Sequence, residues 1–146
     1  MLKNKINIIF ADKFKTDEKL LREILERLIK AEKIQKRVVV SLVVVVNKTI
    51  KEINKMFRGK NRITSILSFP LLSSSKFITP EEELFLGDII INIEKIKKEK
   101  KDFKAEIKKN LAHSFLHLLS YTHNSQRDEK IMKKEEEKLI GVLNDI

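Results

Sequence analysis

The sequence feature that most restricts the fold is a run of nine residues, 38–46, in which every residue except Ser41 is apolar and most are valine. β-Branched residues favour extended backbone, and a strand without polar alternation is usually covered on both faces. The run therefore predicts a strand that is buried on both faces, or nearly so. This run is also the longest near-apolar stretch of the sequence. Because a membrane-spanning helix needs about 20 apolar residues, the run is too short to form one.

The remaining pattern predicts a single α+β domain over residues 1–146, with one mixed four-stranded sheet and helices packed on it. Short β-branched or apolar runs predict the other strands, and apolar residues at three- and four-residue spacing predict the helices. The expected strands are 6–10, 38–46, 63–69 and 84–93, and the expected helices are 17–31, 47–58, most of 94–120 with a break near 101–102, and 128–143.

Several positions within these elements carry more specific expectations. Thr16 and Asn47 precede or begin apolar periodic segments, so we expect them to cap the first two helices. The same periodicity places Phe57 and Ile131 on buried helix faces. Residues 71–83 are rich in serine and hold Pro80, and we expect this long irregular stretch to be the most mobile.

Composition limits the class of protein. The chain has 146 residues, which suits one compact domain. It has no cysteine, which excludes disulfides, thiolate zinc fingers, iron–sulfur clusters and a cysteine nucleophile. The N-terminus has no long apolar segment or small-residue cleavage site, so we expect a cytoplasmic protein.

The net charge of +10 has two interpretations. A polyanionic partner, most simply nucleic acid, is one of them. A general bias of the composition towards lysine is the other, because lysine and arginine total 31 but only six of these are arginine. The positions of the arginines therefore carry more information than the net charge.

All three histidines, His113, His117 and His123, fall within eleven residues. The first two are spaced i and i+4 on a predicted helix, so they project from one face. The five-residue step to His123 allows the chain to leave the helix and fold back. Three imidazoles without a fourth protein ligand are typical of a catalytic zinc site, with water in the open position. The alternative is three unconnected histidines.

A zinc protease of the metzincin type has a similar spacing of histidines. That motif also needs a glutamate directly after the first histidine as general base. Here Ser114 takes that place and has no carboxylate. Protease chemistry is therefore weakly supported.

Three blocks of the sequence resemble the YbeY family of bacterial rRNA maturation factors. Residues 113–123, HSFLHLLSYTH, are similar to the family signature HGxLHLxGYDH. Residues 54–70, NKMFRGKNRITSILSFP, are similar to NxxYRGKDxPTDVLSFP, and residues 86–91, LGDIII, match an LGDI segment. The order and spacing of these blocks agree over roughly residues 5–143.

The resemblance implies a small α+β fold with one Zn²⁺ per chain, held by His113, His117 and His123 together with water. It implies a metal-dependent endoribonuclease that acts on single-stranded RNA, in maturation of the small-subunit rRNA 3′ end and in ribosome quality control. It also implies that Arg58 lies in the groove beside the metal. RNA and the ribosome or small-subunit assembly factors are the implied partners, and we expect a monomer.

Four positions depart from the family pattern. Ser114 and Ser120 replace two glycines, Thr122 replaces an aspartate, and Ser65 replaces another aspartate in the strand block. If residue 120 needs positive φ, serine costs about 1 kcal/mol relative to glycine. Loss of an orienting carboxylate near a ligand can cost about 10–100-fold in metal affinity or activity.

Basic residues near the second block are candidates for binding phosphate. We expect Arg58 to bind a phosphate bidentately as the catalytic arginine, with Lys60 and Arg62 as further RNA contacts. The alternative is that they are ordinary loop cations. Asp88 is a candidate general base, although a turn or capping role is favoured for it. The lysines of residues 95–109 either steer RNA or form a solvated helix face.

Three functions therefore remain open. The first is the metal-dependent endoribonuclease. The second is a non-catalytic RNA- or ribosome-binding factor whose zinc site is structural or a relic, as the four departures would suggest. A zinc peptidase is the third, and the missing glutamate after His113 counts against it.

Overall fold

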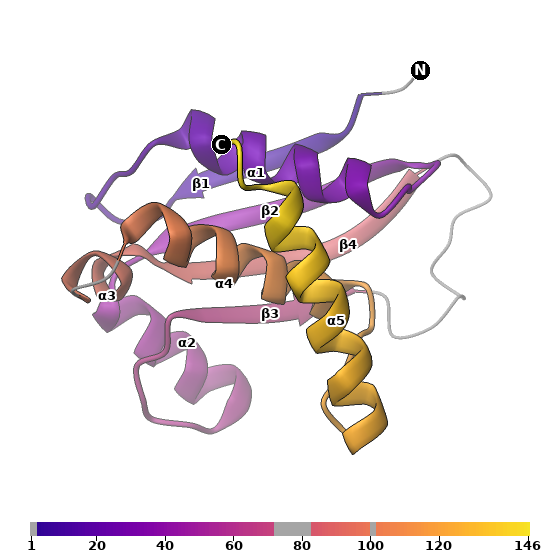
Figure 1. Cartoon of the computed structure of the whole chain (residues 1–146). Helices are drawn as coiled ribbons and strands as arrows, with labels where there is room; N and C mark the ends of the chain where they lie inside the picture. The colour runs from indigo at the N-terminus through magenta and orange to yellow at the C-terminus, as the bar shows by residue number, and fades with distance from the viewer. Residues whose placement is uncertain (1–2, 72–82, 100–101) are drawn as a thin grey trace.

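The computed structural model describes residues 3–71, 83–99 and 102–146 (Figure 1). Most of the serine-rich stretch that we expected to be mobile, residues 72–82, lies outside the described residues.

Within the described part of the chain, four strands form one mixed sheet in the order β1-β2-β4-β3. β1 is parallel to β2 and β2 is parallel to β4, while β3 runs antiparallel to β4 along the edge of the sheet. The α+β class and the mixed four-stranded sheet are thus confirmed. The strands are β1 (Lys5–Phe10), β2 (Arg37–Val45), β3 (Ile66–Pro70) and β4 (Glu83–Asn92).

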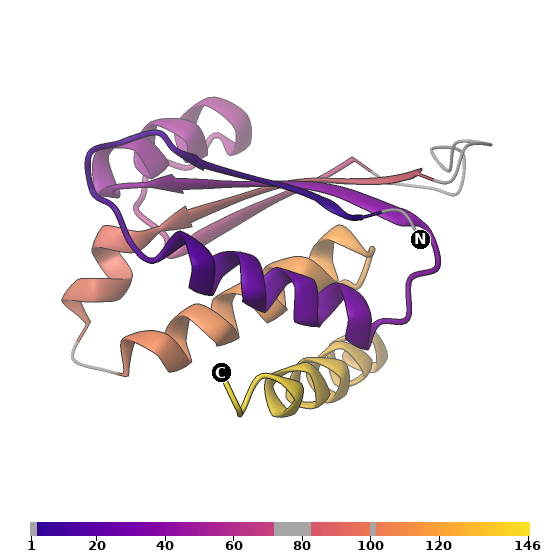
Figure 2. The same cartoon turned by 90° about the horizontal axis from the view of Figure 1, so that it is seen from above.

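Helices cover both faces of this sheet. Figure 2, which shows the sheet nearly edge-on, places α2 on one face and α1 and α4 on the other, with α5 packed outside α1 and α4. The predicted helical stretch from residue 94 is two helices, of which α3 ends at Lys98 and α4 begins at Phe103; the break expected near residues 101–102 falls partly outside the described residues. The helices are α1 (Glu18–Ala31), α2 (Asn47–Arg58), α3 (Ile93–Lys98), α4 (Phe103–Leu118) and α5 (Gln126–Val142).

β2 contributes to two separate cores. Its residues Val38, Leu42 and Val44 point into the larger core, between the sheet and α1, α4 and α5. Val45 points to the opposite face, into a smaller core under α2. Burial of a valine or leucine side chain stabilises the fold by about 1.5–3 kcal/mol, so a strand placed between two cores contributes from both faces. The predicted strand, covered on both faces or nearly so, is confirmed as Arg37–Val45: one face is fully buried, and the other is buried at Val45 and half-buried at residues 39, 41 and 43.

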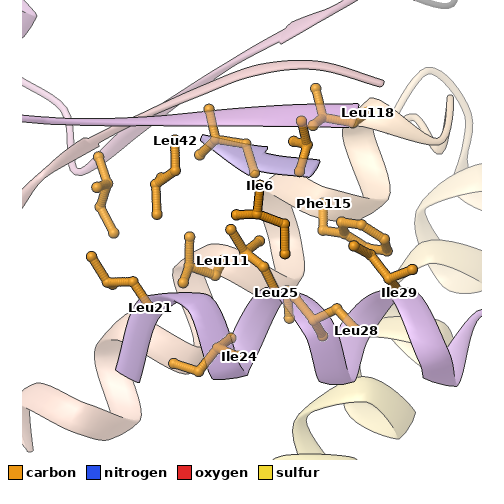
Figure 3. Packing of buried hydrophobic residues seen from close by; sticks show 14 of the residues in the cluster. Ile6, Leu21, Ile24, Leu25, Leu28, Ile29, Leu42, Leu111, Phe115 and Leu118 are labelled. Atoms are coloured by element: carbon orange, nitrogen blue, oxygen red, sulfur yellow. The ribbon is translucent and has the colours of Figure 1, made fainter. Parts of the chain in front are cut away.

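The larger core is built by two amphipathic helices. Figure 3 shows Leu25 and Leu28 of α1 facing Leu111 and Phe115 of α4 beneath the sheet. All four side chains are fully buried. Because the apolar stripe of α4 faces this core, the opposite, polar side of the helix must point away from it.

Two helix starts differ from the prediction. Asp17, rather than Thr16, caps α1, because its carboxylate accepts a backbone N–H of the first turn. α2 begins at Asn47 itself, after Val46, which makes no side-chain cap bond. The backbone N–H of Asn47 instead donates to Glu94 Oε1 at 2.9 Å. An acceptor distant in the sequence thus replaces the expected local cap.

Two residues expected on buried faces are exposed. Phe57 is 66% exposed and Ile131 is 47% exposed. α2 lies over the edge of the sheet and buries Ile50 but not its last turn, and the buried face of α5 runs through Met132 and Leu139 instead. Helical periodicity alone does not say how far a helix extends beyond the sheet that it covers.

None of the described helices is long and apolar enough to cross a membrane.

α4 ends in a left-handed turn at Ser120, whose φ is +77°. The N–H of Ser120 donates to His117 O and the N–H of Tyr121 donates to Leu116 O, which is the Schellman pattern of helix termination. Glycine normally occupies this position because it has no Cβ to crowd the backbone. The expectation that residue 120 needs positive φ is confirmed.

A pair of acidic side chains joins the end of α1 to α5. Burial, together with a hydrogen bond and the negative charge of Glu135, raises the pKa of the Glu32 carboxyl to about 7, against an opposing effect of Lys138. Oε1 of Glu32 is buried and has no hydrogen-bond partner among the described residues. The Glu32 carboxyl is therefore protonated in the folded protein up to a higher pH than an ordinary glutamate.

Replacing Ser120 with glycine should stabilise the protein by about 1 kcal/mol, because the strain of positive φ at a residue with Cβ is removed. For a chain of this size, the expected rise in melting temperature is about 3 °C. Thermal unfolding followed by circular dichroism measures it. Lys33, with φ of +53°, offers the matched variant Lys33→Gly away from the histidines, and an unchanged or lower melting temperature for Ser120→Gly would contradict the assignment.

Replacing Glu32 with glutamine should stabilise the protein at pH 8 by about 1 kcal/mol after allowance for solvent screening, and have little effect at pH 5. Because the folded-state pKa of Glu32 is raised from 4.5 to about 7, its contribution is complete below pH 4.5 and is lost as pH rises through 7. Urea unfolding at both pH values measures the difference. The control is Glu52→Gln, at an exposed position on α2. An equal gain in stability from Glu32→Gln at both pH values would show that folding does not raise the pKa of Glu32.

Candidate metal centre

Three histidines meet where α4 ends. His113 and His117 lie one turn apart on the polar side of α4, and the turn at Ser120 returns the chain so that His123 faces them. The ring of His113 is 4.7 Å from that of His117 and 5.3 Å from that of His123, measured between centroids. The structure thus brings together all three predicted metal ligands.

The ring nitrogens are arranged as a metal ion requires. One ligand nitrogen from each histidine lies within 4.8 Å of the others, and the Nε2 atoms of His113 and His117 are 3.1 Å apart. A tetrahedral zinc with Zn–N bonds of about 2.0–2.1 Å separates two ligand nitrogens by about 3.3 Å. The His113–His117 pair is close to this separation, and the three histidines together could hold a metal ion.

Hydrogen bonds at the other ring nitrogens fix the tautomers. His117 Nδ1 lies 3.1 Å from the backbone oxygen of Tyr121, which can only accept, so Nδ1 carries the proton. His113 Nδ1 donates in the same way to the Glu136 carboxylate at 3.2 Å. When neither ring carries a second proton, both Nε2 atoms present lone pairs towards each other. Such an arrangement is unfavourable without a cation and is typical of metal-binding histidines.

The protonation state of His117 also favours metal binding. Burial lowers the pKa of this imidazole below its usual value, and positive charge on His113, His123 and Arg58 lowers it further. The hydrogen bond to the Tyr121 carbonyl opposes this effect. At neutral pH the ring is therefore neutral, which is the form that binds metal ions.

The histidines line a pocket of about 340 Å³ together with Arg58, Pro70 and residues 66–68 of β3. Arg58, the last residue of α2, reaches over the edge of the sheet into this pocket. Its Nη2 donates to the backbone oxygen of Ser68 at 2.9 Å, and its guanidinium carbon lies 5.6 Å from the centre of the Phe69 ring. The arginine is thereby held beside the histidines, although it comes from the opposite face of the sheet.

Lys60 and Arg62 lie in the loop that follows α2 and do not line this pocket. Both side chains are exposed. The buried side chain of Asn54 donates to the backbone oxygen of Arg62 at 3.1 Å, and the backbone oxygen of Asn54 accepts from Lys60. The loop is thus anchored to α2, with its cations outside the histidine pocket.

Asp88 lies away from the histidines. It is in the middle of β4, not at a strand start, and its side chain lines a groove with Phe57 and Phe69 on the face covered by α2. A general base must be within hydrogen-bond reach of the reacting group. The position of Asp88 therefore does not support a role as base beside the metal.

The lysines of residues 95–109 do not form one uniformly solvated face. Lys97 Nζ lies 5.0 Å from the ring centre of Phe14 and 5.5 Å from that of Phe103. Lys108 donates to the backbone oxygen of Ile146. These side chains have structural contacts, and their role in steering RNA stays a prediction.

The four departures from the family pattern have local structural consequences. Ser114 is fully buried, and its hydroxyl shares a hydrogen bond with Ser68 of β3. Thr122 donates to the Asp128 carboxylate of α5 at 3.2 Å. The backbone oxygen of Ser65 accepts from the N–H of Asn92. With the left-handed turn at residue 120, none of the substitutions separates the three histidines.

Glu136 is the residue at this site that the sequence analysis missed. Its side chain is only 17% exposed and accepts the His113 hydrogen bond from α5. A signal was present, because Glu136 is spaced four residues after the buried Met132 and three before the buried Leu139. A carboxylate on the inward face of an amphipathic helix needs a partner there.

Comparison with known proteins shows the family of this chain. The family model described as "Endoribonuclease YbeY" matches residues 3–144. Proteins of that name from Clostridium beijerinckii and Clostridioides difficile are 36% and 35% identical, and each match covers 91% of this chain and 93% or 92% of the relative. A solution structure of a Thermotoga maritima protein is 26% identical with a TM-score of 0.64, covering 94% of this chain and 87% of that one. The chain belongs to the YbeY family.

Replacing Glu136 with glutamine should weaken Zn²⁺ binding about 10–100-fold, because His113 loses the carboxylate that orients its ring and raises its basicity. Competition with a chromophoric chelator measures the affinity without reference to activity. Glu137→Gln removes the same charge from the neighbouring, exposed position and should leave the affinity unchanged. Equal affinities for the two variants would show that Glu136 does not orient His113.

Proposed function

We propose that this member of the YbeY family is a metal-dependent endoribonuclease that cleaves single-stranded RNA. The observation that carries the proposal is the placement of Arg58 in the same pocket as His113, His117 and His123. Three imidazoles and one guanidinium match the needs of phosphodiester cleavage, namely a metal ion and a phosphate contact. The description of the family and of the relatives as endoribonucleases supports it.

Each histidine has a definite part in this proposal. His113, His117 and His123 hold one Zn²⁺ ion, and the bonds to Glu136 and to the Tyr121 carbonyl keep two of the rings oriented. When bound, the ion supplies a water of lowered pKa and neutralises charge on phosphoryl oxygens. Three protein ligands leave a position open for that chemistry.

Arg58 positions the phosphate. Its bond to the Ser68 carbonyl engages one of the five N–H donors of the guanidinium and holds the group at the pocket. The other donors can bind two phosphate oxygens at once, which an ammonium group cannot do in the same fixed geometry. Arg58 is therefore the catalytic arginine of the proposal.

Lys60 and Arg62 are proposed to bind RNA phosphates outside the pocket. Both are exposed and follow Arg58 directly in the chain. The net charge of +10 would accelerate encounter with RNA in a manner that weakens with salt.

The biological setting is proposed from the family. We place the protein in maturation of the small-subunit rRNA 3′ end and in ribosome quality control, in the cytoplasm. Ribosomal RNA and small-subunit assembly factors are the proposed partners, and a monomer is the proposed working state.

A non-catalytic RNA- or ribosome-binding factor is the second candidate, and Thr122 favours it. The hydroxyl of Thr122, bonded to Asp128, stands where the family pattern has a carboxylate beside the last ligand. A zinc peptidase has no such support, because the Ser114 side chain after His113 is buried against Ser68 and offers no general base.

The zinc-loaded protein should cleave a single-stranded RNA, and EDTA or His117→Ala should abolish the cleavage because both remove the metal. Arg58→Lys should lower the rate about 100-fold, since one preorganised bidentate contact is lost. Gel analysis of an end-labelled RNA measures all four samples. Glu26→Gln, at an exposed position on α1 away from both the histidines and α2, is the control.

An opposite result is equally informative. RNA that is bound but left intact by every sample would reject the enzyme and support the binding factor. Cleavage that persists in EDTA and in His117→Ala would reject the metal-dependent mechanism.

A further inference from the structure

A groove on the face of the sheet opposite the histidines is lined mainly by apolar and aromatic side chains, although it opens at the surface. It holds about 260 Å³ between the last turns of α2 and the strands β3 and β4, and is lined by Ile53, Phe57, Phe69, Asp88 and Ile90. Phe57 is 66% exposed, and its ring meets that of Phe69 edge to face at a centroid distance of 5.7 Å. Most of the Phe57 ring therefore stays accessible to a ligand.

The helix α2, which borders this groove, is rich in positive charge. Residues 47–62 carry six cations and one acid, Glu52. Lys51, Lys55 and Arg58 follow one another at four- and three-residue spacing on α2, so they lie along one side of the helix, and all are exposed. Such a stripe is complementary to the phosphates of a nucleic-acid backbone.

The groove itself is not suited to phosphate. Asp88 is the one charged residue among those that line it, and its carboxylate would repel an anion. An aromatic face, aliphatic walls and a single acceptor suit a nucleobase, which stacks on rings and donates N–H groups from its edge. The groove lining therefore suits the base of a nucleotide, and the stripe of cations on α2 suits its phosphate.

Arg58 connects this groove with the histidine pocket. It lines that pocket, and its guanidinium also lies over the Phe69 ring, which lines the groove. A chain whose phosphate is held by Arg58 thus has the histidines on one side of the edge strand β3 and the groove on the other.

We propose that the groove of Phe57, Phe69 and Asp88 binds one base of a single-stranded RNA whose neighbouring phosphate lies on Arg58. The inference rests on the proposed function, since it describes how the same substrate is held. Phe57 stacks on the base, and Asp88 accepts a hydrogen bond from its N–H groups. The base in the groove therefore belongs to a nucleotide that lies beside the cleaved bond, and it takes no part in the cleavage itself.

The first test is the affinity for a short fluorescent single-stranded RNA, measured by anisotropy in EDTA so that the RNA stays intact. Phe57→Ala should weaken binding about 5- to 100-fold, and Phe57→Trp should retain it, because stacking needs a flat ring. Met56→Ala is the matched control: Met56 is the neighbouring residue of α2, is 76% exposed and does not line the groove. Because Phe57 is exposed, its truncation leaves the core intact.

Two further measurements separate a base from a phosphate. The salt dependence of affinity should be unchanged in Phe57→Ala and reduced in Lys55→Ala, since only the second loses a phosphate contact. An RNA of the same length without bases should bind equally to the wild-type protein and to Phe57→Ala.

The outcomes distinguish failure of the inference from failure of the proposed function. Unchanged RNA affinity in Phe57→Ala, with cleavage by the wild-type protein, would overturn the base site, leave the endoribonuclease standing and point to a protein partner for the groove. A loss of affinity for the base-free strand as well would also overturn it. Absence of both RNA binding and cleavage in the wild-type protein would reject the proposed function itself.

Discussion

Burial of β2 on both faces is the constraint on which the rest of the structure depends. The valines of this strand alternate between the larger core and the core under α2, so helices must cover the sheet from both sides. The chain meets this need by placing α1 and α4 on one face and α2 on the other (Figure 2). The histidines and Arg58 therefore come from opposite sides of the sheet, and they can meet only around its edge strand, β3.

The sequence predicted the elements and the clustering of the histidines well because both depend on local spacing. Histidines four residues apart on a helix face the same way in almost any fold, and the valine run has few alternatives to a buried strand. The sequence could not predict those features that depend on how far one element extends past another. Phe57 and Ile131 have helical spacing suited to burial, yet nothing covers them within the described structure. Glu136 was missed because its partner, His113, lies 23 residues away on another helix.

The helix ends also include features that the sequence could predict and features that it could not. Asp17 and Thr16 are both able to cap a helix, and only backbone geometry decides between them. The N–H of Asn47 is bound by Glu94, an acceptor that sequence periodicity around Asn47 cannot reveal. The strain at Ser120, by contrast, was expected from the motif, because a chain that returns His123 to His117 must reverse its direction within a few residues.

The hydrogen bond between Glu136 and His113 makes the metal centre dependent on the helix that follows it in the chain. α5 is synthesised after all three histidines, and it delivers the acceptor that orients the first of them. A growing chain that has completed α4 but not α5 holds every ligand and lacks this orienting contact. The order of the elements thus delays a fully oriented metal centre until the last helix has docked.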